Sequence, residues 1–187
     1  AAGPAPKIVL PQATSFTLSN GLTVIHNYNP AVPLISSQLV VKSGSGANPL
    51  AQPGLSSFTA QLLQEGTATR SASQIADDVA QLGAFLGTGS GTDASFAQLT
   101  SLKTTFPHAL DVLADVVQHP QFPSAEVERQ RASRIGELAQ QRENAGAVAA
   151  RVEAAALYGP KHPYGYVELG TEESRRVTRE RSFEIRL

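Results

Sequence analysis

The first third of the sequence alternates polar and apolar residues in short runs, which is the pattern of β-strands. Residues 15–18 and 22–28 flank an Asn-Gly dipeptide that favours a tight hairpin turn. Residues 34–41 form a further apolar and β-branched run, and residues 44–54 are rich in Gly, Pro, Asn and Ser. We therefore expect a hairpin, a third strand and then a loop.

The rest of the chain repeats apolar residues every three or four positions, which predicts helices. The expected helices cover about residues 54–64, 73–82, 106–118 and 124–142, with a continuation over 148–157 and a short last helix at 171–174. Ser73 and Ser124 are the expected N-caps of the second and fourth helices, and Asn144 and Gly146 are expected to interrupt the fourth.

Two strands are expected between the second and third helices. They cover residues 84–86 and 94–102, and the glycine-rich residues 87–91 are expected to form the turn between them. Strands joined by hairpins and mixed with helices favour an α+β fold with a mixed, largely antiparallel sheet packed against helices.

The length of 187 residues suits one domain. Residues 1–13 are small and Pro-rich, which is typical of a linker or a processed N-terminus, so the domain is expected over residues 14–187. Phe183, Ile185 and Leu187 alternate with polar residues. They are compatible with a last strand, and a truncated C-terminal end is the open alternative.

Composition excludes several classes of protein. A hydrophobic content of 41% excludes a disordered chain, and a net charge of −1 provides no basic surplus for binding nucleic acid. No apolar run is long enough for a membrane span. The absence of cysteine excludes disulfides, thiolate nucleophiles and Cys-ligated zinc, and it is compatible with an extracytoplasmic compartment such as the bacterial periplasm.

Motifs for chemistry are scarce. The four histidines are His26, His108, His119 and His162. His108 and His119 lie on or beside one expected helix, but a rise of about 1.5 Å per residue puts them roughly 16 Å apart, too far to share a metal ion. The sequence contains neither a P-loop nor a G-x-S-x-G motif. The residues alone thus indicate a soluble α+β domain without an active constellation.

A series of short motifs nevertheless follows in a specific order. These are L-S-N-G-L-T-V at 18–24, P-G-L-S-S-F at 53–58, E-G-T at 65–67, H-P-Y-G at 162–165 and G-T-E-E at 170–173. Their order and spacing resemble the pitrilysin/insulinase family of zinc metallopeptidases, which includes the mitochondrial processing peptidases. The resemblance extends from about residue 16 to 179.

The resemblance implies a lost catalytic site. The family's motif H-x-x-E-H places two zinc-binding histidines and a general base on one helix, and here Ser57, Ala60 and Gln61 stand at those positions. Counting onward, the third zinc ligand falls on Glu137 and an auxiliary glutamate becomes Gln130. We therefore expect no zinc cofactor. Glu137 is either a solvated helix residue or a relic that hydrogen-bonds Ser57 or Gln61.

The resemblance also implies a partner. The family builds its peptidase from two halves, of which one carries the zinc motif and the other is often a degenerate copy that closes the chamber. We expect this chain to be a non-catalytic domain that binds a catalytic half or subunit, with a peptide as a possible further ligand. The family's usual Asn-Ala in its substrate-binding strand is Gly87-Thr88 here.

Two alternatives remain open from the sequence. The chain is a repurposed interaction module without a proteolytic role, or it is a hydrolase with an unrecognised site built on His26, His162, Glu137 and serines of the loops. The resemblance to the peptidase family also predicts how two helices pack. Ser57 and Gln61 should lie within about 8 Å of Glu137 on a neighbouring helix.

Overall fold

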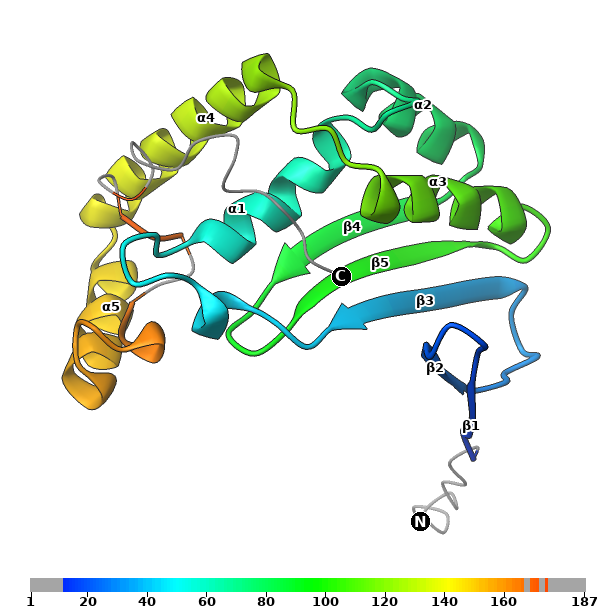
Figure 1. Cartoon of the computed structure of the whole chain (residues 1–187), viewed down its shortest axis with the longest axis horizontal. Helices are drawn as coiled ribbons and strands as arrows, with labels where there is room; N and C mark the ends of the chain where they lie inside the picture. Colours follow the sequence, from blue (N-terminus) through cyan, green and yellow to red (C-terminus); the bar gives the residue numbers. More distant parts are fainter. Residues whose placement is uncertain (1–11, 167–168, 172–173, 175–187) are drawn as a thin grey trace, which may run out of the picture. The chain divides into compact units, whose positions relative to one another are not determined.

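The computed structural model of the chain describes residues 12–166, 169–171 and 174 (Figure 1). The strands are β1 (Thr14–Thr17), β2 (Thr23–His26), β3 (Leu34–Val41), β4 (Phe85–Ser90) and β5 (Ser95–Leu102). The helices are α1 (Leu55–Leu62), α2 (Ala72–Gln81), α3 (Phe106–Gln118), α4 (Ser124–Glu143) and α5 (Ala145–Tyr158). Short 3-10 turns occur at Ser45–Ala47, Leu63–Glu65 and Pro163–Gly165. The expected α+β class is confirmed.

The described residues up to Leu34 form a compact unit of their own, and the residues from Ile35 onward form a second, larger one. In the smaller unit, β1 and β2 pair in antiparallel register as the sequence predicts, with Thr17 opposite Thr23. Gly21 in the turn has a φ of 87°, a conformation that glycine adopts without steric cost. The expected linker and C-terminal strand fall largely outside the described residues, and the single-domain boundary stays a prediction.

The larger unit contains a three-stranded sheet with the order β3-β5-β4, so β4 lies at an edge. β4 and β5 pair in antiparallel register from Phe85↔Thr100 to Ser90↔Ser95. Residues 87–90 therefore belong to β4, and the expectation that residues 87–91 form a turn was wrong for all of them except Gly91. The physical reason is aromatic packing, because a Cβ on Gly89 would come within 2.5 Å of the Phe96 ring.

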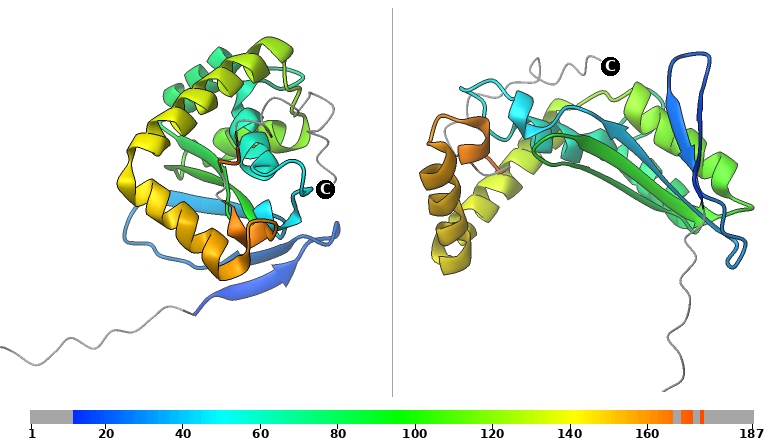
Figure 2. Two further views of the ribbon diagram at one scale, coloured as in Figure 1. Left: turned by 90° about the vertical axis from the view of Figure 1, so that its left-hand side faces the viewer. Right: turned by 90° about the horizontal axis from the view of Figure 1, so that it is seen from below.

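The hydrophobic core lies between one face of this sheet and the helices α1, α2 and α3 (Figure 1). Phe58 and Leu62 of α1, Leu99 of β5 and Val116 of α3 are almost completely buried. The right-hand view of Figure 2 looks onto the opposite face of the sheet, where no helix lies between the viewer and the strands. The helices thus cover one face of the sheet and place α1 beside the edge strand β4.

A buried carboxylate joins α3 to the segment before α2. Asp115 accepts hydrogen bonds from Thr67 Oγ1 at 2.7 Å, Thr69 Oγ1 at 2.8 Å and the Arg70 guanidinium at 2.6 Å. His119 Nδ1 lies 3.2 Å from its second oxygen. Burial alone would raise the pKa of Asp115, but these hydrogen bonds outweigh burial and lower the pKa from 3.8 to about 2. The sequence analysis did not identify this cluster.

The N-cap of helix α4 is Pro123, which has no side-chain group to cap the helix. The expected cap at Ser124 was therefore wrong, because Ser124 is the first residue of the helix. Asn144 ends α4 and caps α5, because its side chain accepts a hydrogen bond from the Ala147 backbone. Gly146 lies inside α5, so only Asn144 interrupts the helical path.

The helix expected at residues 171–174 lies mostly outside the described residues. None of the helices among the described residues has the length and apolar character that crossing a membrane requires.

Ser71→Ala is expected to destabilise the protein by about 1 kcal/mol, and Ser73→Ala by much less. The N-cap of α2 is Ser71 and not Ser73, because Ser71 Oγ accepts from the Gln74 backbone and the Gln74 side chain accepts from the Ser71 backbone. Urea unfolding of both variants measures the difference. A larger loss for Ser73→Ala would contradict the capping box.

Candidate functional site

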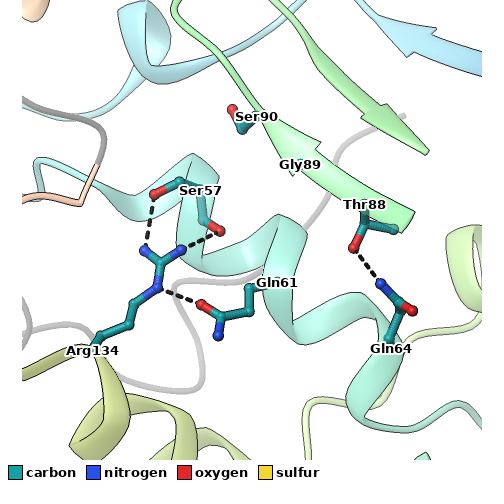
Figure 3. A pocket seen from close by; sticks show the side chains of 7 residues that line it. All are labelled: Ser57, Gln61, Gln64, Thr88, Gly89, Ser90 and Arg134. Atoms are coloured by element: carbon teal, nitrogen blue, oxygen red, sulfur yellow. Dashed lines mark hydrogen bonds between the residues drawn. The ribbon is translucent and has the colours of Figure 1, made fainter. Parts of the chain in front are cut away.

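Three elements of the larger unit meet around a polar cavity of about 320 Å³ (Figure 3). Helix α1 with the turn that follows it, the edge strand β4 and helix α4 each contribute side chains. The lining residues are Ser57, Gln61 and Gln64, then Thr88, Gly89 and Ser90, and Arg134. The cavity therefore contains Ser57 and Gln61, two of the three α1 positions that the family motif indicates.

Arg134 connects α4 to α1 at this cavity. Its guanidinium donates one hydrogen bond to Ser57 Oγ and one to the Ser57 carbonyl oxygen, each 3.0 Å long, and its Nε donates to Gln61 Oε1. Figure 3 shows the three bonds converging from α4 onto one face of α1. The guanidinium also lies over the Phe58 ring, 5.4 Å from its centroid, and the residue is only 7% exposed. These contacts hold a cation in a fixed position against α1.

Gln61 is bound from both sides. Its side-chain oxygen accepts from Arg134, and its side-chain nitrogen donates to Gln130 Oε1 at 2.6 Å. Gln130 in turn donates to Glu65, which also accepts from Arg129 at 2.5 Å. The network therefore runs from the cavity to the surface, and it fixes which end of the Gln61 amide faces Arg134.

The structure brings Ser57, Gln61 and Gln130 together, and it confirms the expected packing of α1 against α4. Ala60 is buried, with 4% exposure. Glu137 is exposed on α4, and Arg134, three residues earlier, is the α4 residue that reaches both Ser57 and Gln61. The interpretation of Glu137 as a relic of the site stays a prediction.

Sequence reasoning missed Arg134, although a signal was present. The buried residues of α4 include Val127, Arg134 and Leu138. Arg134 thus lies seven residues after one buried apolar residue and four before another, which is the spacing of a single helical face. A cation on the apolar face of a helix indicates a bound partner, because burying an isolated charge is costly.

Comparison with known proteins identifies the family. Residues 23–162 match the family described as Insulinase (Peptidase family M16). The chain belongs to the M16 peptidase family. The expected resemblance to pitrilysin and insulinase is thereby confirmed.

Curated M16 relatives are longer than this chain. An uncharacterized zinc protease of Mycobacterium tuberculosis is 31% identical over 158 residues, which cover 84% of this chain and 36% of the relative. A probable mitochondrial-processing peptidase subunit beta of Schizosaccharomyces pombe is 29% identical over 166 residues, 88% of this chain and 36% of the relative. The matched part spans about a third of these proteins.

Solved M16 structures share the fold. The structure described as a peptidase M16 inactive domain from Pseudomonas fluorescens superposes with a TM-score of 0.86 at 27% identity, over 91% of this chain and 42% of that chain. Pitrilysin superposes with a TM-score of 0.74 at 26% identity, over 88% of this chain and 18% of that chain. The M16 fold of the described residues is therefore established independently of any motif.

The side chains at the cavity of this M16 domain do not fit a zinc ion. Zinc sites in proteins use imidazole, thiolate or carboxylate ligands, whereas Ser57 and Gln61 offer a hydroxyl and an amide. The guanidinium of Arg134 adds a positive charge that repels a dication. Within residues 12–166, 169–171 and 174, no three His, Asp or Glu side chains come close enough to hold a metal.

Proposed function

We propose that this chain is a non-catalytic domain of an M16 peptidase, which forms one wall of a peptide-binding chamber together with a catalytic H-x-x-E-H half or subunit. The observation that carries the proposal is Arg134, whose guanidinium binds Ser57 and Gln61 at the two positions that correspond to the zinc-binding histidines. At these two positions the Arg134 guanidinium takes the place of the zinc ion, and its hydrogen bonds connect α4 to α1. The neighbour described as an inactive M16 domain supports the same interpretation.

Peptide binding by the domain is supported by its edge strand. In the part of the chain that the structure describes, β4 pairs with β5 alone, which leaves one row of its backbone groups for another strand. Extended peptides bind such edges by adding a strand to the sheet. The lining of the cavity by Thr88, Gly89 and Ser90 places it directly beside this edge. An extracytoplasmic location is part of the proposal and is supported only by the absence of cysteine.

The purified chain is expected to contain no stoichiometric zinc and to cleave no peptide, whereas a complex with a catalytic H-x-x-E-H protein from the same genome should cleave. The reason is that Ser57 and Gln61 provide no imidazole ligand. Metal analysis after dialysis, size-exclusion chromatography of the mixture and a fluorogenic peptide assay measure the three properties.

The control for this experiment is the same catalytic protein with its H-x-x-E-H glutamate replaced by glutamine, because any remaining cleavage then comes from this chain. Zinc-dependent cleavage by the chain alone would contradict the proposal. Failure of the two proteins to associate would favour the alternative of a repurposed interaction module.

A further inference from the structure

Two exposed phenylalanines lie beside the β4 edge, on the side of the sheet that faces away from the core. Phe85 on β4 is 59% exposed and Phe96 on β5 is 37% exposed. Neither side chain belongs to the hydrophobic core, although the neighbouring Leu86 and Ala97 do. Since successive side chains of a strand point to opposite faces, both rings lie on the outer face of the sheet, which the right-hand view of Figure 2 shows.

Both rings lie over glycines of β4. A Cβ on Gly87 would lie 3.2 Å from the Phe85 ring, and a Cβ on Gly89 would lie 2.5 Å from the Phe96 ring. Gly89 and Phe96 are also directly opposite each other in the β4–β5 pair, the arrangement in which an aromatic ring covers a glycine. The outer face of β4 therefore presents aromatic carbon atoms in place of two side chains.

The hydrogen bonds between β4 and β5 indicate which backbone groups of β4 face a peptide. Across the turn, the Gly91 N–H donates to the Ala94 carbonyl oxygen at 2.8 Å. Because an antiparallel pair alternates between hydrogen-bonded and non-hydrogen-bonded positions, Gly89 and Gly87 are the residues that bond to β5. The backbone N–H and C=O groups of Thr88, which lies between them, therefore point toward the edge that faces away from β5.

We propose that the β4 edge selects an extended peptide with bulky apolar side chains, aromatic ones above all, at alternate positions. The inference rests on the proposed function, because it takes strand addition at β4 as given and names the side chains that the peptide presents. Directly opposite residues of two paired strands project to the same face, so the peptide residues opposite Gly87 and Gly89 project to the outer face. Their neighbours face the polar cavity beside α1, which suits small polar side chains.

The glycines leave room for a large peptide side chain beside each ring. Directly opposite Cβ positions of neighbouring strands lie about 4.5–5.5 Å apart, so a peptide side chain there reaches the ring that covers the glycine. Aromatic pairs stabilise such a contact beyond the burial of apolar area, through edge-to-face or offset stacking. The contact also covers the Phe85 ring, which is largely exposed without a peptide.

Three fluorescent peptides test the proposal. All are neutral Ser/Thr sequences with blocked ends. The first contains two Phe residues separated by one Thr, the second contains the same two Phe residues next to each other, and the third contains none. Adjacent residues of a strand face opposite sides, so the second peptide must direct one ring toward the polar cavity. Fluorescence anisotropy with the full chain is expected to give a Kd about tenfold lower for the first peptide than for the second.

Phe85→Ser is the test variant, and it is expected to lower this preference to less than about threefold. Phe85 lies outside the core, so its replacement leaves the core intact. Leu157→Ser on α5 is the matched control, because it removes an apolar side chain that is 69% exposed and should leave the preference unchanged. Circular dichroism of both variants verifies the fold.

N-methylated forms of the first peptide test strand addition itself. One form is methylated at the backbone nitrogens of its Thr residues and the other at those of its two Phe residues. A strand that pairs along one edge uses only one of its two rows of N–H groups, so one form should lose binding and the other should retain it.

The outcomes separate this inference from the proposed function. Equal Kd values for the first and second peptides would overturn the selection of alternate apolar side chains and leave peptide binding at β4 intact. Equal binding of both methylated forms, or no binding of any peptide, would contradict strand addition and this inference together. If the chain binds no peptide and forms a dimer in size-exclusion chromatography, a second copy occupies the edge and the proposal is overturned.

Discussion

Asp115→Ala is expected to lower the free energy of unfolding by about 3–5 kcal/mol, the largest effect of any single substitution considered for this domain. The Asp115 carboxylate accepts from Thr67, Thr69 and Arg70, so alanine leaves three donors in a partly buried position without their acceptor. A domain of this size is typically stable by only about 5–15 kcal/mol. Urea denaturation followed by circular dichroism measures the loss.

Asp111→Ala is the matched control for this substitution. Asp111 lies one turn earlier on α3 and is exposed, so its removal should change the free energy of unfolding by less than about 0.5 kcal/mol. A loss below about 1 kcal/mol for Asp115→Ala would show that the carboxylate cluster does not stabilise the connection between α3 and the segment before α2.

The Asp115 carboxylate makes the free energy of unfolding depend on pH. The pKa of Asp115 is about 2 in the folded chain and lies below its ordinary value of 3.8, so the folded state binds its proton less readily than the unfolded state. The stabilisation by the ionised Asp115 is therefore complete above about pH 5 and is lost as the pH falls toward 2. It contributes about 2 kcal/mol to the free energy of unfolding. In Asp115→Asn this part of the acid destabilisation should be absent when unfolding is measured between these pH values.

Local periodicity predicts α1 and α3 well because apolar spacing determines both helices. The expected ranges 54–64 and 106–118 compare with Leu55–Leu62 and Phe106–Gln118 in the structure. Each of these helices buries one apolar face against the sheet, so the pattern in the sequence and the packing coincide.

Two predictions of local structure were wrong for local physical reasons. The glycines of β4 look like a turn because glycine is common in turns, but here they make room for the aromatic rings of Phe85 and Phe96. Apolar spacing indicates Ser73 as the cap of α2. It does not reveal that Ser71 and Gln74 form a capping box, and this box makes Ser71 the N-cap.

The polar contacts of the candidate site could be predicted only in part. Matching the motif identified Ser57, Gln61 and Gln130, which the structure does bring together. It did not identify Arg134, because the five motif positions carried over from the family do not include this residue.

Zinc binding is expected to appear in this chain only when Arg134 is changed together with the α1 positions. Ser57→His with Gln61→His supplies two imidazoles at i and i+4, but the guanidinium remains beside them and provides no ligand. Adding Arg134→Glu removes this positive charge and offers a carboxylate from the same α4 position. The triple variant should therefore bind zinc more than about 100-fold tighter than the double variant, since the loss of repulsion and the gain of a ligand add up.

Competition with a zinc-sensitive dye measures both affinities, and Glu137→Ala in each background is the control. The exposed position of Glu137 predicts that its removal leaves both affinities unchanged. If instead the double variant already binds zinc tightly and Glu137→Ala abolishes that binding, then the residue count is correct and α4 must rotate to present Glu137. The contact of Arg134 with Ser57 would in that case be one of two arrangements of α4 against α1, and the argument for a permanently non-catalytic site would lose its structural basis.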